Sequence, residues 1–150
     1  MIYKQPSIYK SGEDVEKAIN DNFILLSPKI LDKYKSYVDW EAFESNQINF
    51  NKLTKIFLCG MPFRATTSFT PYYSDSDGGG DTDWPIFAYF EMDENYQALS
   101  NYFPLCSSGN VYNKWGMTST GNGKIWVRLT KNFNIPVGYN FLLSGALQLQ

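Results

Sequence analysis

The sequence predicts a mainly β protein, an antiparallel β-sandwich or barrel head preceded by an N-terminal helical segment. Three observations support this prediction. The spacing of apolar residues changes from a helical to a strand-like period near residue 50. Later segments rich in β-branched and aromatic residues are separated by turn-forming sequences. Aromatic residues make up 17% of the chain, a content that suits half-buried sheets and polar-edged binding surfaces.

The first helix is expected to begin near Gly12. Ser11 is a suitable N-cap, and the acidic residues of the first turn favour the positive end of the helix dipole. A stripe with steps of three and four residues follows at Val15, Ile19, Asn22 and Leu26. Pro28 ends this helix, because proline lacks the amide hydrogen that a helix interior needs. A second helix is predicted over residues 28–44, where apolar residues keep helical spacing.

The polar residue in this stripe favours self-association. A helix of about 15 residues is marginal alone in water, so its apolar side must pack on the head or on other copies. Asn22 occupies a seam position where an apolar residue would stabilise more, and polar seam residues fix register and strand number in helical bundles. The sequence therefore predicts a helical bundle of several copies with Val15, Ile19, Asn22 and Leu26 in its seam.

A change in composition predicts a boundary near residue 50, between a helical attachment segment (1–50) and a β head (51–150). Residues 56–94 carry one arginine and seven acidic residues, a net charge of −6. Residues 95–150 carry four basic residues and no acidic one, a net charge of +4. These two stretches are expected to attract each other, either within one subunit or between subunits.

The head should contain strands over 53–59, 84–92, 124–130 and 139–149. In the third of these, Ile125, Val127 and Leu129 alternate with Trp126 and Arg128. Because successive side chains of a strand point to opposite faces, one face should be core and the other should offer an indole and a guanidinium.

The composition excludes several function classes. No histidine is present, which removes the commonest general base and the favoured zinc ligand. A net charge of −2 makes nucleic acid an unexpected partner. No apolar run approaches the roughly 18 residues of a membrane span, and the N-terminus lacks a signal-peptide core, so we expect synthesis in a cytoplasm without membrane insertion. Cys59 and Cys106 stand in apolar surroundings and are expected to be buried free thiols, with a disulfide as the alternative.

Two segments resemble a known family. The first contains Tyr9, Gly12, Val15, Ala18, Ile19, Asn20 and Phe23, and the last contains Pro136, Gly138, Ser144 and Gly145. Both are similar to segments of baseplate and receptor-binding tail proteins of siphophages that infect lactic-acid and other Gram-positive bacteria. The resemblance implies a homotrimer at the tail tip of a virion, attached to other baseplate proteins through its N-terminal segment and binding cell-wall saccharide. The alternatives are a structural baseplate or adaptor protein without sugar binding, and a free-standing carbohydrate-binding module.

Aromatic residues beside polar ones are the candidate saccharide ligands, since sugars stack on rings and donate or accept hydrogen bonds through their hydroxyls. Trp115 is the strongest candidate, because Asn113 and several glycines surround it and suggest an exposed loop. Each ring is also a natural core or trimer-interface residue, and such a structural role is the more common one for buried aromatic residues. The candidates are Trp115, Asn113, Trp84, Trp126, Arg128, Tyr72 and Tyr73.

Four carboxylates lie within nine residues at Asp75, Asp77, Asp81 and Asp83. Such spacing suits a calcium ion, but the EF-hand pattern fails, so a solvated acidic hairpin tip is the preferred interpretation and no cofactor is predicted. Carboxylates could also hydrolyse a glycoside, with Asp81 or Asp83 opposite Glu91 or Glu94. Nothing in the spacing selects such a pair, and a small β head is poorly suited to a deep cleft, so a non-catalytic head is predicted.

Overall fold

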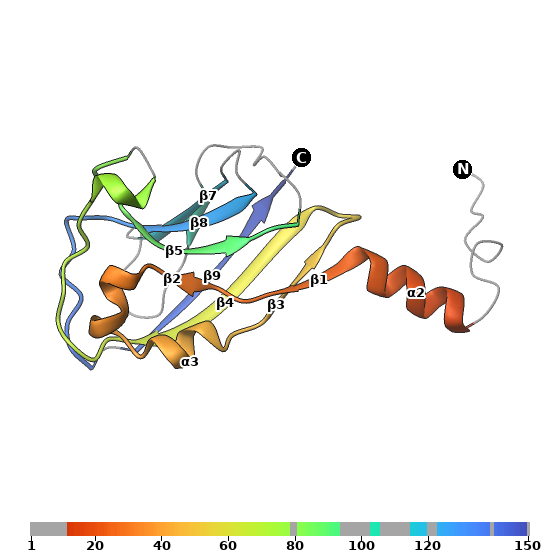
Figure 1. Ribbon diagram of the computed structural model, residues 1–150, viewed down its shortest axis with the longest axis horizontal. Coiled ribbons are helices and arrows are strands. Elements are labelled where there is room, and N and C mark those ends of the chain that lie inside the picture. Colours follow the sequence, from red (N-terminus) through yellow and green to blue (C-terminus); the bar gives the residue numbers. More distant parts are fainter. Residues whose placement is uncertain are drawn as a thin grey trace.

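The computed structural model describes residues 12–78, 81–93, 103–105, 115–119, 123–138 and 140–149. Within them the chain forms two antiparallel sheets (Figure 1). The four-stranded sheet has the order β1 (Phe23–Leu26), β3 (Ile48–Asn51), β4 (Ile56–Arg64), β9 (Asn140–Gln148). The five-stranded sheet has the order β2 (Lys29–Ile30), β5 (Ile86–Glu91), β8 (Lys124–Leu129), β7 (Trp115–Ser119), β6 (Phe103–Leu105).

The mainly β prediction is confirmed, with 37% of the residues in strands against 22% in helices. Each of the four predicted strand segments contains a strand, namely β4, β5, β8 and β9. The described strands form two facing sheets and do not close into a barrel. The edge strands β6 and β9 lie next to each other, while the chain passes from β1 directly into β2 and so from one sheet to the other.

One hydrophobic core fills the space between the sheets. Phe50 and Met61 come from the four-stranded sheet, and Phe90 and Val127 from the five-stranded sheet, and none of these four side chains is exposed. Burying a side chain of this size contributes about 1.5–3 kcal/mol, so the core dominates the stability of the head. The alternation predicted for 124–130 is confirmed for its apolar positions, since Ile125, Val127 and Leu129 are all buried, while Trp126 between them is only half-buried.

The first helix, α2 (Gly12–Asn22), begins where the sequence predicted, but it ends earlier than expected. The next four residues, Phe23–Leu26, are all apolar and pair with β3 as strand β1. Leu26 lies opposite Ile48 and is buried in the core. The four-residue helical seam is therefore wrong at Leu26, because strand pairing and core burial outweigh the continuation of the helix.

The second predicted helix, over 28–44, is also wrong. This region holds β2, a 3-10 helix η1 (Asp32–Tyr37), an extended bridge from Val38 to Ala65, and the short helix α3 (Trp40–Glu44). Tyr34, Val38 and Phe43 all enter the core, so the apolar spacing was real. A 3-10 turn brings residues three apart onto one side, and the spacing alone does not distinguish it from an α-helix.

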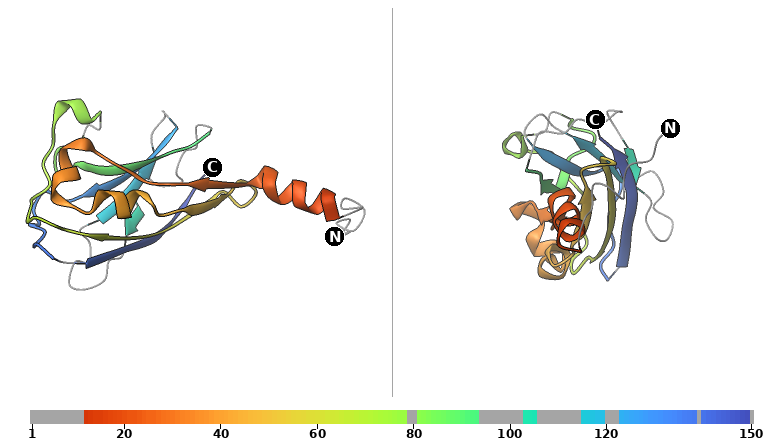
Figure 2. Two further views of the ribbon diagram at one scale, coloured as in Figure 1. Left: turned by 60° about the horizontal axis from the view of Figure 1, so that its bottom comes forward. Right: turned by 90° about the vertical axis from the view of Figure 1, so that its right-hand side faces the viewer.

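The predicted boundary at residue 50 falls inside strand β3, and residues 23–51 contribute strands and core side chains to the same two sheets. Helix α2, by contrast, projects from one end of the two-sheet body in line with β1 (Figures 1 and 2). In the described part of the chain no helix is long and apolar enough to cross a membrane. Cys59 lies in β4 opposite Gly145, and Cys106 lies outside the described residues.

Candidate functional site

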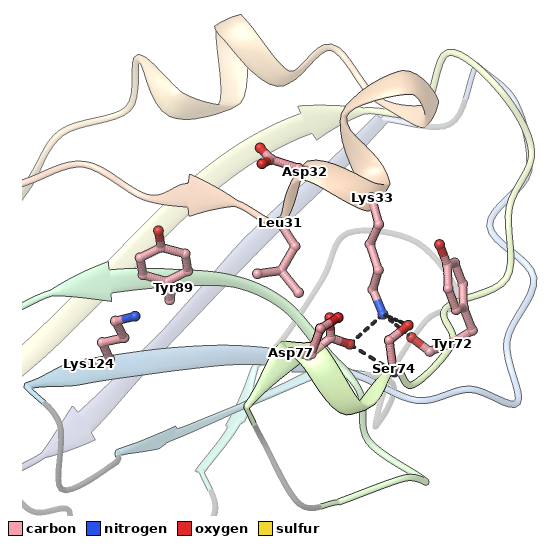
Figure 3. A pocket seen from close by; sticks show the side chains of 9 residues that line it. Leu31, Asp32, Lys33, Tyr72, Ser74, Asp77, Tyr89 and Lys124 are labelled. Atoms are coloured by element: carbon pink, nitrogen blue, oxygen red, sulfur yellow. Dashed lines mark hydrogen bonds and ion pairs between the residues drawn. The ribbon is translucent and has the colours of Figure 1, made fainter.

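A pocket of about 510 Å³ lies between the five-stranded sheet and the segment 72–77 (Figure 3). Tyr72 and Tyr89 supply aromatic rings to its wall. The volume falls within the range of about 300–1,000 Å³ typical of small-molecule sites. Figure 3 shows Tyr89 and Lys124 at one end and Lys33, Ser74, Asp77 and Tyr72 at the other, with Leu31 between them.

Lys33 fixes one wall of the pocket. Its Nζ donates to Asp77 Oδ2 at 2.5 Å, to the Tyr72 carbonyl at 2.5 Å and to Ser74 Oγ at 3.3 Å. The side chains of Lys33 and Asp77 are only 14% and 8% exposed. A nearly buried ion pair of this kind costs much to break, because one charge would then stay buried without compensation. The segment 72–77 is thereby tied to η1.

The carboxylate of Asp77 has a second task in the same segment. Its Oδ2 accepts the Ser74 amide at 3.0 Å and completes a capping box on the short 3-10 helix η2 (Asp75–Asp77). Gly78 then ends η2 with a positive φ of 84°, a conformation that glycine adopts without strain. This local structure places Ser74, Ser76 and Asp77 in the pocket lining.

Tyr34 supports the wall from the core side. Its hydroxyl donates to the Tyr72 carbonyl at 3.0 Å and accepts the Tyr72 amide at 3.1 Å. Burial raises the pKa of the Tyr34 phenol well above its usual value, so the hydroxyl keeps its proton and remains a donor at neutral pH. Tyr72 is held through its backbone, and its ring stays 46% exposed.

Ammonium groups lie over both tyrosine rings of the pocket. Lys33 Nζ is 4.2 Å from the centroid of the Tyr72 ring, and Lys124 Nζ is 4.6 Å from that of the Tyr89 ring. Cation–π contacts at partly exposed sites contribute about 0.5–1 kcal/mol. These contacts help to hold the two rings in position.

Arg128 and two tryptophans form a second cluster, on the face of β8 that also carries Lys124. Arg128 Nε donates to Thr118 Oγ1 at 3.0 Å, and Nη1 donates to the Trp84 carbonyl at 2.7 Å. Its guanidinium carbon lies 4.8 Å from the centroid of the Trp126 ring. Arg128 is only 7% exposed, and burial lowers its pKa. In this arrangement the guanidinium joins β7, β8 and the segment before β5.

Among the predicted saccharide residues whose side chains the structure describes, only Tyr72 belongs to the pocket lining. Trp115 lies in β7 opposite Leu129, where the sequence suggested a loop, and Asn113 lies outside the described residues. Tyr73 is half-buried beside the lining, where partial burial and the Asp75 carboxylate raise the pKa of its phenol.

The aspartates of the acidic cluster bind different groups within the chain. Asp77 binds Lys33, and Asp83 pairs with Lys131 at 2.6 Å. Asp81 Oδ1 accepts the amides of Asp83 and Trp84. Within the described ranges no group of three or more potential ligand side chains is placed to hold a metal ion. The Asp83–Lys131 pair also joins the acidic and basic stretches within one chain.

The carboxylates suggested for glycoside hydrolysis are not brought together in the pocket. Neither Asp81 nor Asp83 belongs to its lining, Glu91 is exposed at the end of β5, and Glu94 lies outside the described residues.

Sequence reasoning missed Lys33, Tyr89 and Lys124. A signal was present for Tyr89, because its hydroxyl makes it the one polar side chain within the apolar run Ile86–Phe90. In the structure Tyr89 lies opposite Trp126 on the adjacent strand β8. No local signal marked Lys33, whose partner Asp77 is 44 residues away. Comparisons of the chain with protein-family models, with curated proteins and with solved structures found no match in any of the three. The pocket is therefore the basis for assigning a function.

Proposed function

We propose that the chain is a receptor-binding protein of a phage tail baseplate, a homotrimer whose β head attaches to saccharide of the host cell wall. The observation that carries this proposal is the pocket, where two tyrosine rings stand among hydroxyl and charged side chains. Saccharides combine weakly polar C–H faces with many hydroxyls, and they are recognised by rings together with a few placed polar groups.

The positions of the pocket and of α2 at opposite ends of the molecule support the proposal. The helical turns η1 and η2, which border the pocket, lie at the end of the two-sheet body away from α2 (Figures 1 and 2). A tail-tip protein needs such an arrangement, with attachment at its N-terminal end and ligand binding at the far end. The resemblance of residues 9–23 to the N-terminal segments of these proteins supports the same orientation.

The state of the pocket carboxylates favours binding over catalysis. Glycoside hydrolysis by two carboxyl groups requires them to face each other across the substrate. In the pocket, Asp77 is held in the wall by Lys33, and Asp32 pairs with Lys35 at 3.1 Å. We therefore assign the pocket a binding role without a cofactor.

A structural adaptor protein is the second candidate, and the region around the base of α2 favours it. Phe23, Leu25 and Leu53 are 42%, 61% and 71% exposed there, and Val15 on the helix is 40% exposed. Exposed apolar residues at one end of a protein mark a surface for other chains. Both candidates use this end for assembly, and only the receptor-binding protein also uses the pocket.

Binding of the purified protein to wall fragments from a panel of Gram-positive bacteria tests the proposal. Tyr72→Ala removes the exposed ring but keeps the backbone groups that Tyr34 and Lys33 hold, so the fold should persist. A lost stacking contact of about 0.5–1.5 kcal/mol corresponds to a loss of affinity of roughly 2- to 12-fold.

Tyr73→Ala is the matched control, since it removes the same side chain one residue outside the lining and should bind like the unmodified protein. Equal binding by the Tyr72→Ala and Tyr73→Ala proteins would contradict the assignment of the pocket. Binding to no wall preparation at all would favour the adaptor.

A further inference from the structure

The pocket contains charged side chains, and each acidic one has a basic partner. Asp77 and Lys33 form a pair within the lining, and Asp32 of the lining pairs with Lys35 beside it. The first pair is nearly buried and the second is open to solvent, since Asp32 is 94% exposed. The two carboxylates of the lining, Asp32 and Asp77, therefore do not require a positively charged ligand to balance their charge.

The second lysine of the lining also has an acidic neighbour. In the β5–β8 register Lys124 stands directly opposite Glu91. Residues opposite each other in an antiparallel pair project to the same face with Cβ atoms about 5 Å apart. The pocket and its immediate border hold four lysines, Lys29, Lys33, Lys35 and Lys124, and the last three of these lie beside Asp77, Asp32 and Glu91.

We propose that the pocket takes an uncharged saccharide, such as a neutral hexose or N-acetylhexosamine unit of a wall polysaccharide. This inference rests on the proposed function and adds the chemical class of the ligand. An anionic unit would compete with Asp77 for Lys33 and leave a nearly buried carboxylate without its cation. Neutral hydroxyls make no such demand, because they can donate to the exposed carboxylate of Asp32 or accept from Lys124 while every ion pair stays closed.

The test uses an array of purified bacterial polysaccharides that contains neutral members and members with phosphodiester or uronic acid groups. The unmodified protein should bind neutral members only. Its affinity for them should change less than twofold between 50 and 500 mM NaCl, since screening acts on charged ligands. Tyr72→Ala should weaken that binding.

Lys124→Gln supplies a second readout. Glutamine keeps a hydrogen-bond donor but loses the charge and the cation–π contact with Tyr89, so binding of a neutral ligand should fall about threefold, far less than the loss expected for an anionic ligand. Lys17→Gln, at an exposed position on α2 away from the pocket, is the matched control for the lost charge.

The outcomes distinguish an error in the ligand class from an error in the proposed function. Binding to phosphorylated or acidic polysaccharides that Tyr72→Ala weakens, that falls tenfold or more in high salt and that Lys124→Gln abolishes would overturn the neutral class and leave the proposed function standing. Binding to no polysaccharide would contradict the proposed function and this inference with it.

Discussion

The two ends of this molecule are built by different means. At the pocket end, Lys33 and Asp77 form a nearly buried ion pair, and Tyr34 holds the backbone of Tyr72 by two hydrogen bonds. At the α2 end, apolar side chains such as Leu25 and Leu53 face outward, 61% and 71% exposed. A polar site that is complete within one chain is suited to a ligand, whereas an apolar surface left open is suited to other protein chains.

The first prediction concerns the Lys33–Asp77 ion pair, whose loss should destabilise the pocket end of the protein more than any other change proposed below. Asp77→Ala leaves Lys33 without its anion and removes the cap of η2, so it should lower the free energy of unfolding by about 3 kcal/mol or more, measured by urea denaturation. The double variant Lys33→Met/Asp77→Leu should regain a substantial part of that loss, because no uncompensated charge remains.

Asp83→Ala is the control for that comparison. It breaks a pair with Lys131 whose side chains are 67% and 45% exposed, so its cost should stay below about 1 kcal/mol. An equal cost for Asp77→Ala and Asp83→Ala would show that the pocket wall does not depend on the buried pair.

The second prediction concerns the α2 end. Val15 is 40% exposed in the single chain, so Val15→Asp should leave the stability of the head unchanged. If α2 assembles copies along its apolar side, three aspartates would meet at the seam, and light scattering should change from about three times 17.2 kDa to a lower mass. Lys17→Asp places the same side chain at a neighbouring exposed position and should keep the higher mass. A monomeric unmodified protein would argue against assembly through α2.

The smallest effect is a pH dependence at the pocket wall. Tyr34→Phe removes two hydrogen bonds to Tyr72 and should cost about 1–2 kcal/mol at neutral pH. Burial raises the folded-state pKa of Tyr34 above the ordinary value of 10.0, so the folded protein holds this proton more tightly than the unfolded chain does. The Tyr34 contribution is therefore complete below pH 10 and declines as the pH rises beyond it.

Urea denaturation between pH 8 and pH 11 measures this decline. The unmodified protein should lose stability faster above pH 10 than Tyr34→Phe does, so the gap between the two should narrow. A constant gap would contradict a protonated donor at Tyr34.

The strands of the head were predictable because each carries its own signal. In β8, alternating apolar residues at Ile125, Val127 and Leu129 mark the core face without knowledge of any neighbour. The region 28–44 was not predictable in the same way. This region contacts distant residues, as in the pairing of Ile30 with Ala88 and the bridge from Val38 to Ala65, and nothing within residues 28–44 encodes those contacts.

The site shows the same limit more strongly. Tyr72 could be selected as an exposed ring, but its pocket partners Lys33, Tyr89 and Lys124 come from three distant segments. Topology brings them together, since β2 and β8 both pair with β5. The charge pattern did point to attraction between acidic and basic stretches, and the Asp83–Lys131 pair is one such contact within the chain. The charge pattern did not predict that Lys33, from the N-terminal segment, pairs with Asp77.

We expect saccharide to bind in the pocket and not at the α2 end. Backbone amide chemical-shift mapping of the intact protein, titrated with an oligosaccharide released from a polysaccharide that it binds, tests this claim directly. The largest shifts should fall at Leu31, Tyr72, Tyr89 and Lys124, while the α2 resonances should stay unchanged. Shifts confined to Trp84, Trp126 and Arg128, or to the α2 end, would contradict binding in the pocket.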